Sequence, residues 1–230
     1  TIEESMQIII KSLLATALAA TLLSGAANAA LLVPAGVAPG ETYQLAFLTS
    51  ADTVATSSDI GDYNAFVQSL ADAAGIGASE NVTWKVIAST AAVDANANAL
   101  VSARVFNLGG ELVATDYADF WDGSHTTGVG IDFEEDGTPR SRNVWTGSNT
   151  DGTEALGFAL GNERAVWAES TSSSGGWISQ STQFTTTAYR LYALSETLIA
   201  PVPAPGALGL LGTSLVGLVA GSRRRSRKLL

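Results

Sequence analysis

One segment of the chain carries a clear helical pattern of apolar positions. Asp59 has the side chain of a helix N-cap, and Gly75 or Gly77 has the conformational freedom of a helix C-terminus. Between them the apolar residues recur at a spacing of 3.6 and share one face: Tyr63, Phe66, Val67, Leu70 and Ala74. The pattern predicts an amphipathic helix over 59–77.

Short runs rich in aromatic and β-branched residues indicate strands. We expect them at Tyr43–Thr49, Val82–Ser89, Val101–Leu108, Ala165–Ala168 and Ala188–Leu194, with a helical turn over Val93–Leu100. The first and last of these strands lie at the two ends of the pattern, and pairing them would close the domain and bring its ends together.

The segment from Asp116 to Gly161 is polar and poor in regular pattern. A stretch this long without secondary structure is uncommon in a compact domain unless it is functional or held by packing. Four tryptophans are available to hold it: Trp121, Trp145, Trp167 and Trp177.

The N-terminal segment has the pattern of a secretory signal. Apolar runs at Ile8–Ile10 and Leu13–Leu23 precede Ala27-Asn28-Ala29, which supplies the small residues that signal peptidase reads. We expect residues 1–29 to be a signal peptide cut after Ala29. Its natural start is predicted at Met6, because the preceding residues include two glutamates that do not suit a positive leader.

The C-terminal segment 201–230 has the pattern of a membrane tail. Gly206–Ser222 has seventeen residues with neither a charge nor a proline, which as a helix would be roughly 26 Å long. Cations follow it at Arg223, Arg224, Arg225, Arg227 and Lys228. The pattern predicts a single transmembrane helix whose basic end stays on the cytoplasmic side.

This tail resembles the PEP-CTERM sorting signal of Gram-negative bacteria. The motif would be Val202-Pro203-Ala204-Pro205-Gly206, with Ala204 where the family usually has glutamate, and the arginine-rich end begins with Arg223, Arg224 and Arg225. The resemblance implies an exosortase-type membrane protease as a partner. It also implies export through the inner membrane, transient anchoring and delivery to the cell surface or extracellular matrix. The alternative is an ordinary single-pass anchor.

The charge balance of the remaining body, residues 30–200, excludes one class of partner. It has six Lys and Arg against twenty Asp and Glu, a net charge near −14 compared with −10 for the whole chain. Such a body repels nucleic acid. The absence of cysteine excludes a disulfide framework and a thiol nucleophile. The single histidine, His125, excludes a multi-histidine zinc site; we expect it to be an exposed loop residue without a catalytic role.

A second resemblance covers the body from Tyr43 to Glu196. Its segments occur in the order Trp84–Ser89, Val105–Leu108, Asp119–Ser124, Val144–Ser148 and Arg190–Leu194. Together these segments are similar to the endostatin-like branch of the C-type-lectin-like fold. The resemblance implies an α+β fold in which strands from both ends pair around a long loop region.

Two clusters are candidates for ligand binding. Asp119, Trp121 and Asp122, together with Trp145, combine carboxylates with indoles, a combination suited to sugars; the alternative is turns and core packing. The acidic run containing Asp132, Glu134 and Asp136 offers oxygen ligands for calcium; the alternative is a solvated loop.

No residue pattern indicates catalysis, and no cofactor other than calcium is suggested. The sequence therefore favours a non-enzymatic exported surface or matrix protein that binds extracellular polysaccharide. A structural surface protein without a ligand and a secreted hydrolase are the alternatives. A hydrolase would need two convergent carboxylates in a cleft, and none of the twenty acidic residues is singled out by its spacing.

Overall fold

The computed structural model describes residues 31–78, 80–125 and 127–203. The predicted signal peptide, the predicted transmembrane helix, Ala204, Pro205, Gly206 and the arginine-rich end lie outside these residues. Within the described ranges, no helix has the length and apolar content that a membrane crossing requires.

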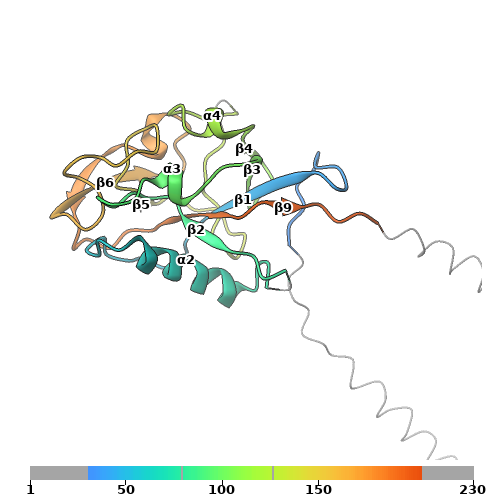
Figure 1. Cartoon of the computed structure of the whole chain (residues 1–230), viewed down its shortest axis with the longest axis horizontal. Coiled ribbons are helices and arrows are strands. Elements are labelled where there is room, and N and C mark those ends of the chain that lie inside the picture. Colours follow the sequence, from blue (N-terminus) through green and yellow to red (C-terminus); the bar gives the residue numbers. More distant parts are fainter. Residues whose placement is uncertain (1–30, 79, 126, 204–230) are drawn as a thin grey trace, which may run out of the picture.

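The described chain has a mixed α+β fold built on two sheets (Figure 1). The main sheet has six strands in the order β2-β8-β1-β3-β4, with β9 also paired to β1. Its strands are β1 (Thr42–Leu48), β2 (Trp84–Val86), β3 (Arg104–Asn107), β4 (Leu112–Ala114), β8 (Tyr192–Ser195) and β9 (Leu198–Ile199). The second sheet consists of β5 (Asn143–Trp145), β6 (Arg164–Glu169) and β7 (Ser181–Phe184).

Strand β1 is the centre of the main sheet. It pairs in parallel with β3 and antiparallel with β8 and β9, so that Ala46 lies opposite Leu194 and Thr42 lies opposite Ile199. The predicted pairing of the first and last strands is confirmed. Its residues from Tyr43 to Leu48 are all buried, which explains why this strand reads as a nearly continuous apolar run.

The predicted amphipathic helix is confirmed as α2 (Ile60–Ala74). The Asp59 side chain accepts a hydrogen bond from the Gly61 backbone N–H at 2.8 Å, and Gly75 ends the helix with a φ of 73°. The helix buries Tyr63, Val67 and Ala71, while the other predicted face residues, Phe66, Leu70 and Ala74, are half-buried. It packs beside β2, the edge strand of the sheet.

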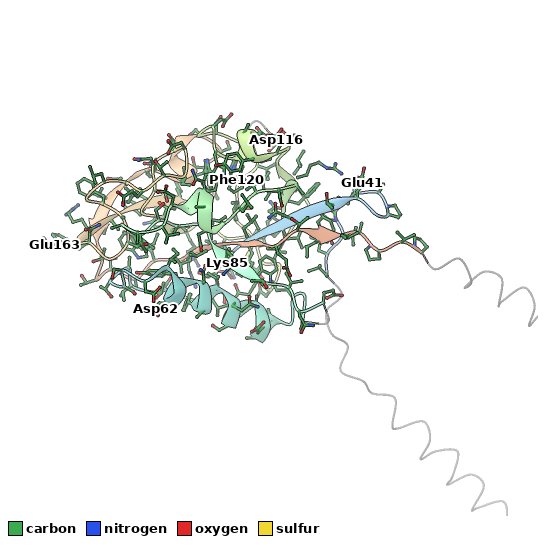
Figure 2. All side chains as sticks on the ribbon, in the orientation of Figure 1. Glu41, Asp62, Lys85, Asp116, Phe120 and Glu163 are labelled. Carbon is green, nitrogen blue, oxygen red and sulfur yellow. The ribbon has the colours of Figure 1, made fainter. Side chains whose placement is uncertain are left out.

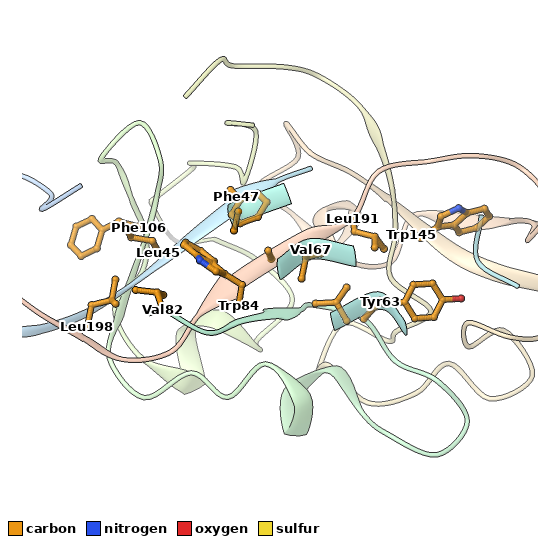
Figure 3. Packing of buried hydrophobic residues seen from close by; sticks show 14 of the residues in the cluster. Leu45, Phe47, Tyr63, Val67, Val82, Trp84, Phe106, Trp145, Leu191 and Leu198 are labelled. Atoms are coloured by element: carbon orange, nitrogen blue, oxygen red, sulfur yellow. The ribbon is translucent and has the colours of Figure 1, made fainter. Parts of the chain in front are cut away.

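Two apolar clusters cover the two faces of the main sheet. Tyr43, Leu45 and Phe47 of β1 belong to the cluster that includes the buried face of α2 and Trp84 (Figure 3). Ala46 and Leu48, which alternate with them, belong to the second cluster, with Phe120, Trp121, Trp177 and Tyr192. The period of two along β1 therefore divides the core into two halves.

The segment predicted to be irregular, 116–161, contains short elements whose partners lie far away in the sequence. It holds α4 (Tyr117–Phe120) and β5, and the short helices α3 (Ala95–Asn98) and η2 (Gly175–Trp177) lie on either side of it in the sequence. Strands β5 and β7 were not predicted, and β2 and β3 are shorter than predicted. Each has only three or four residues, too few to show a pattern without its partner strand.

Backbone hydrogen bonds hold this segment against the rest of the domain. The Ser89 N–H donates to Thr146 O at 2.7 Å, and the Ser89 carbonyl accepts from Leu160 N–H at 2.9 Å. Trp145 N–H donates to Arg190 O at 2.9 Å, which joins β5 to the chain entering β8. The two sheets are thus linked at Arg190.

Gly147 permits the tightest of these contacts. It has a φ of 61°, and a Cβ at this position would lie 2.6 Å from both Leu160 N and Ser89 O. Both atoms belong to the backbone, so neither can move aside as the end of a side chain could.

We therefore predict that Gly147→Ala lowers the free energy of unfolding by about 3 kcal/mol, through backbone strain and overpacking. Gly137→Ala is the matched control, because Gly137 has a φ of 81° with no atom within 4 Å of an added Cβ, and it should cost only about 1 kcal/mol. Urea unfolding measures both, and equal losses would contradict the packing argument.

Candidate functional site

The two tryptophans predicted to bind sugar are both buried. Trp145 is fully buried, its Nε1 donates to Thr187 O at 3.3 Å, and its ring lies 4.8 Å from that of Tyr189. Trp121 is 6% exposed and packs edge-to-face on Phe120. An indole must expose one ring face to stack on a sugar, and neither does. The two also belong to different apolar clusters, so the structure does not bring them together.

The two aspartates of the same predicted site lie at the surface. Asp119 and Asp122 line an open hollow of about 520 Å³ next to α4, together with Thr115, Asp116, Ala118 and Thr127. Asp119 Oδ2 accepts from the N–H and hydroxyl of Thr115 at 2.7 and 3.0 Å, and Asp122 Oδ1 accepts from Ser124 N–H at 2.8 Å. Each carboxylate therefore holds a local turn. These bonds fit the alternative in which the cluster forms turns.

The exposed aromatic residue on α4 is Tyr117, which sequence reasoning did not select. Its side chain is 44% exposed, and it directly follows Asp116, the helix N-cap, which is labelled in Figure 2. No sequence signal marks it, because a helix of four residues is too short to show which of its faces is exposed. The neighbourhood of the predicted sugar site thus contains an exposed phenol ring in place of the buried indole.

His125 is buried, which corrects the expectation of an exposed loop residue. It is 3% exposed, and its ring lies 4.4 Å from that of Trp177. Nδ1 lies 2.7 Å from Val129 O, and since a carbonyl only accepts, Nδ1 carries the proton. Nε2 is buried and has no hydrogen-bond partner among the described residues. Burial lowers the pKa of His125 to about 4 against the opposing effects of the Val129 hydrogen bond, Asp119 and Asp122.

The acidic run predicted to bind calcium is partly used for internal pairing. Glu134 is buried and lies 3.9 Å from the guanidinium of Arg190 and 3.8 Å from that of Arg140. Glu135 is also buried and accepts a hydrogen bond from the Ser50 backbone N–H at 2.7 Å. The two buried carboxylates of the run therefore join it to the segment that precedes β8 and to the segment that follows β1.

The three residues named as calcium ligands have different surroundings. Asp132 is half-buried, and burial raises its pKa; Asp136 is exposed, and hydrogen bonds from Thr138 lower its pKa. Across residues 31–78, 80–125 and 127–203, no group of three or more acidic or histidine side chains is arranged to hold a metal ion. The calcium site stays a prediction.

Comparison with models of known protein families finds no match for this chain, and comparison with curated protein sequences finds none either. The sorting-signal and lectin-like resemblances therefore rest on the residues quoted for them.

The buried His125 predicts a pH dependence of stability. Its folded pKa is below the unfolded value of 6.5, so the unfolded chain binds the proton first. The stabilisation is present above pH 6.5 and is lost as the pH falls towards 4, by about 3 kcal/mol in total. Thermal unfolding measured between pH 7 and pH 4 should show this loss.

The matched variant is His125→Asn, whose amide can still donate to Val129 O but does not titrate. Its stability should be nearly flat over the same pH range, whatever the smaller side chain costs at pH 7. Parallel pH profiles for the two proteins would rule out His125 as the titrating group.

The pairing of Glu134 gives a second prediction. Arg190→Met leaves a buried carboxylate paired only with Arg140, whose side chain is largely exposed, and should lower the free energy of unfolding by about 3 kcal/mol. The double variant Arg190→Met/Glu134→Gln should recover part of that loss, because the unpaired charge is gone. Arg142→Met is the control, since its side chain is exposed and bonds only to Ser141 O. Urea unfolding of all four proteins checks this, and no recovery in the double variant would contradict it.

Proposed function

We propose that this chain is an exported, non-enzymatic protein of a Gram-negative bacterium, delivered to the cell surface or extracellular matrix. Signal peptidase removes residues 1–29, the tail 201–230 holds the protein in the inner membrane, and an exosortase-type protease cuts near Pro203–Gly206. Residues 30–200 are then the working protein.

The observation that carries this proposal is the way the chain leaves the domain. Ala200 N–H donates to Glu41 O, and Ala200 O accepts from Gly40 N–H, both at 2.9 Å. Beyond Ala200 no backbone bond to the domain is formed by the described residues, and Val202 is 69% exposed. The sorting motif therefore begins two residues after the last pairing, where a protease can reach it.

The pairing of β1 with β8 supports a lectin-like body. Strands β1 and β8 from the two ends lie side by side, and the two ends of the described chain lie at one end of the molecule (Figure 1). The long segment between β4 and β6 lies against this sheet. We assign the body to the endostatin-like branch of the C-type-lectin-like fold on this arrangement and on the sequence resemblance, with extracellular polysaccharide as its partner.

The second candidate function is a structural surface protein without a ligand. It is favoured by the burial of Trp84, Trp121, Trp145 and Trp177, because indoles committed to the core are not available for sugar stacking. Trp167 is the one half-buried tryptophan among the described residues, and it packs against Tyr189.

We predict that the extracellular form of the protein ends within the motif. Mass spectrometry of protein secreted by an exosortase-bearing host should find no residue beyond about Gly206, since cleavage there leaves the membrane helix behind. Ala204→Glu, which introduces the residue usual in the family, should raise the cleaved fraction. Pro203→Ser/Pro205→Ser should keep the chain in the membrane fraction. Recovery of an intact Arg223–Lys228 segment outside the cell would refute cleavage.

A further inference from the structure

A second hollow lies at the edge of the main sheet, where β2 pairs with β8. Its volume is about 300 Å³, and it is lined by β2, β8, the residues after α3 and the turn before β9. The side chains that matter are Thr83, Lys85, Asn98, Leu100, Ser102 and Thr197. No motif in the sequence marks this place, because the six residues come from three separate segments.

Buried hydrogen bonds hold one wall of this hollow in place. Gln44 of β1 is buried, and its Nε2 donates to Leu100 O at 3.0 Å and to Ser195 O at 2.8 Å. Its Oε1 accepts from Ser102 N–H at 2.7 Å. Asn98 Nδ2 donates to Val86 O at 2.8 Å. One amide thus ties the wall containing Leu100 and Ser102 to β8, so the hollow is already formed without a ligand.

The cation in this hollow differs from the other cations of the described chain. Each of the five arginines has a partner. Arg104 pairs with Glu41, Arg140 with Glu134 and Arg190 with Asp52, while Arg142 and Arg164 bond to backbone carbonyls. The side chain of Lys85, labelled in Figure 2, has no ion pair or hydrogen bond among the described residues.

The carboxylate in the hollow forms no ion pair with this lysine. Glu196 also lines the hollow, but its Oε1 accepts a hydrogen bond from Thr83 N–H at 3.0 Å, and none of the ion pairs among the described residues joins it to Lys85. No group among the described residues accepts a hydrogen bond from the three N–H donors of the Lys85 ammonium. It is therefore available to an anionic ligand.

We propose that this hollow binds a carboxylate-bearing sugar unit, a hexuronate, of an acidic polysaccharide. Lys85 pairs with the carboxylate. Both N–H groups of Asn98 donate within the protein, and the hydroxyls of Ser102 and Thr197 bond to each other, so these side chains accept hydrogen bonds from the ring hydroxyls through their remaining lone pairs. The side chain of Leu100, 61% exposed, packs on the apolar face of the ring. The volume is at the lower end of ligand pockets, which suits one ring rather than a longer segment.

The net negative charge of the body does not prevent this binding. At physiological salt the screening length is about 8 Å, so a ligand in the hollow responds mainly to the charges that line it. This inference rests on the proposed polysaccharide partner and names the unit that is recognised. It does not depend on tail cleavage, so the two can fail separately.

The test titrates the full chain, purified in a detergent without a sugar headgroup, with glucuronate and with galacturonate. Isothermal titration should give a Kd on the order of 1 mM for one of the two, as expected for a single ring. Lys85→Gln should weaken this binding at least tenfold. Arg142→Gln is the control, because it removes an exposed cation outside the hollow, and it should leave the Kd unchanged.

Two further ligands show whether the sugar ring or the carboxylate accounts for the binding. Glucose has the ring without the carboxylate, and acetate has the carboxylate without the ring; both should bind at least tenfold more weakly than the hexuronate. Equal binding of glucose, equal binding of acetate, or an unchanged Kd in Lys85→Gln would each overturn the proposal. Leu100→Ser, which keeps the charge, should weaken hexuronate binding and leave acetate binding unchanged.

Discussion

The structure depends on one strand being enclosed on all sides. Strand β1 is hydrogen-bonded to β3 along one edge and to β8 and β9 along the other, and both of its faces are buried. Its alternating side chains supply both apolar clusters, one shared with α2 and one with the aromatic residues around Phe120. Because the partners along one of its edges come from the far end of the chain, the domain is complete only when residues near 195 have been placed. The pairing of β1 with β8 and β9 completes the sheet and also places the two ends of the described chain at one end of the molecule.

The second constraint is the absence of cysteine in a domain with long connections. A disulfide would hold such a segment through the unfolded state as well as the folded one. Here the long segment is held by backbone hydrogen bonds at Ser89 and Arg190 and by buried tryptophans of the two apolar clusters. That use has a functional cost, because Trp121 and Trp145 cannot both fill the core and stack on a sugar. For the proposed sugar binding, the groups that remain exposed are polar side chains and single apolar or aromatic residues such as Tyr117 and Leu100.

What the sequence could predict follows from the range of the interactions involved. Helix α2 is determined by its own apolar spacing and caps, and β1 by its composition, so both were found. Strands β5 and β7 are held by partners far along the chain, and their few residues carry no independent pattern. The burial of His125 was missed because its cage is assembled from Phe120 and Trp177, more than fifty residues apart. Lys85 was missed for a different reason. It stands out because its side chain has no partner among the described residues whereas each arginine has one, and only the structure shows this.

The distribution of charge over the body bears on the ligand specificity proposed for the hollow beside Lys85. A body near −14 repels a polyanion over most of its surface, and its arginines are turned to internal pairs and backbone carbonyls. An acidic polymer that approaches this protein therefore finds few attractive points, and an unpaired ammonium in a preformed hollow is the strongest of them among the described residues. Repulsion elsewhere does not weaken recognition at that point, since screening confines it to short range. Under the proposed function, the repulsion restricts the contact to one sugar unit at a time, so that the protein associates with an acidic matrix without being coated by it.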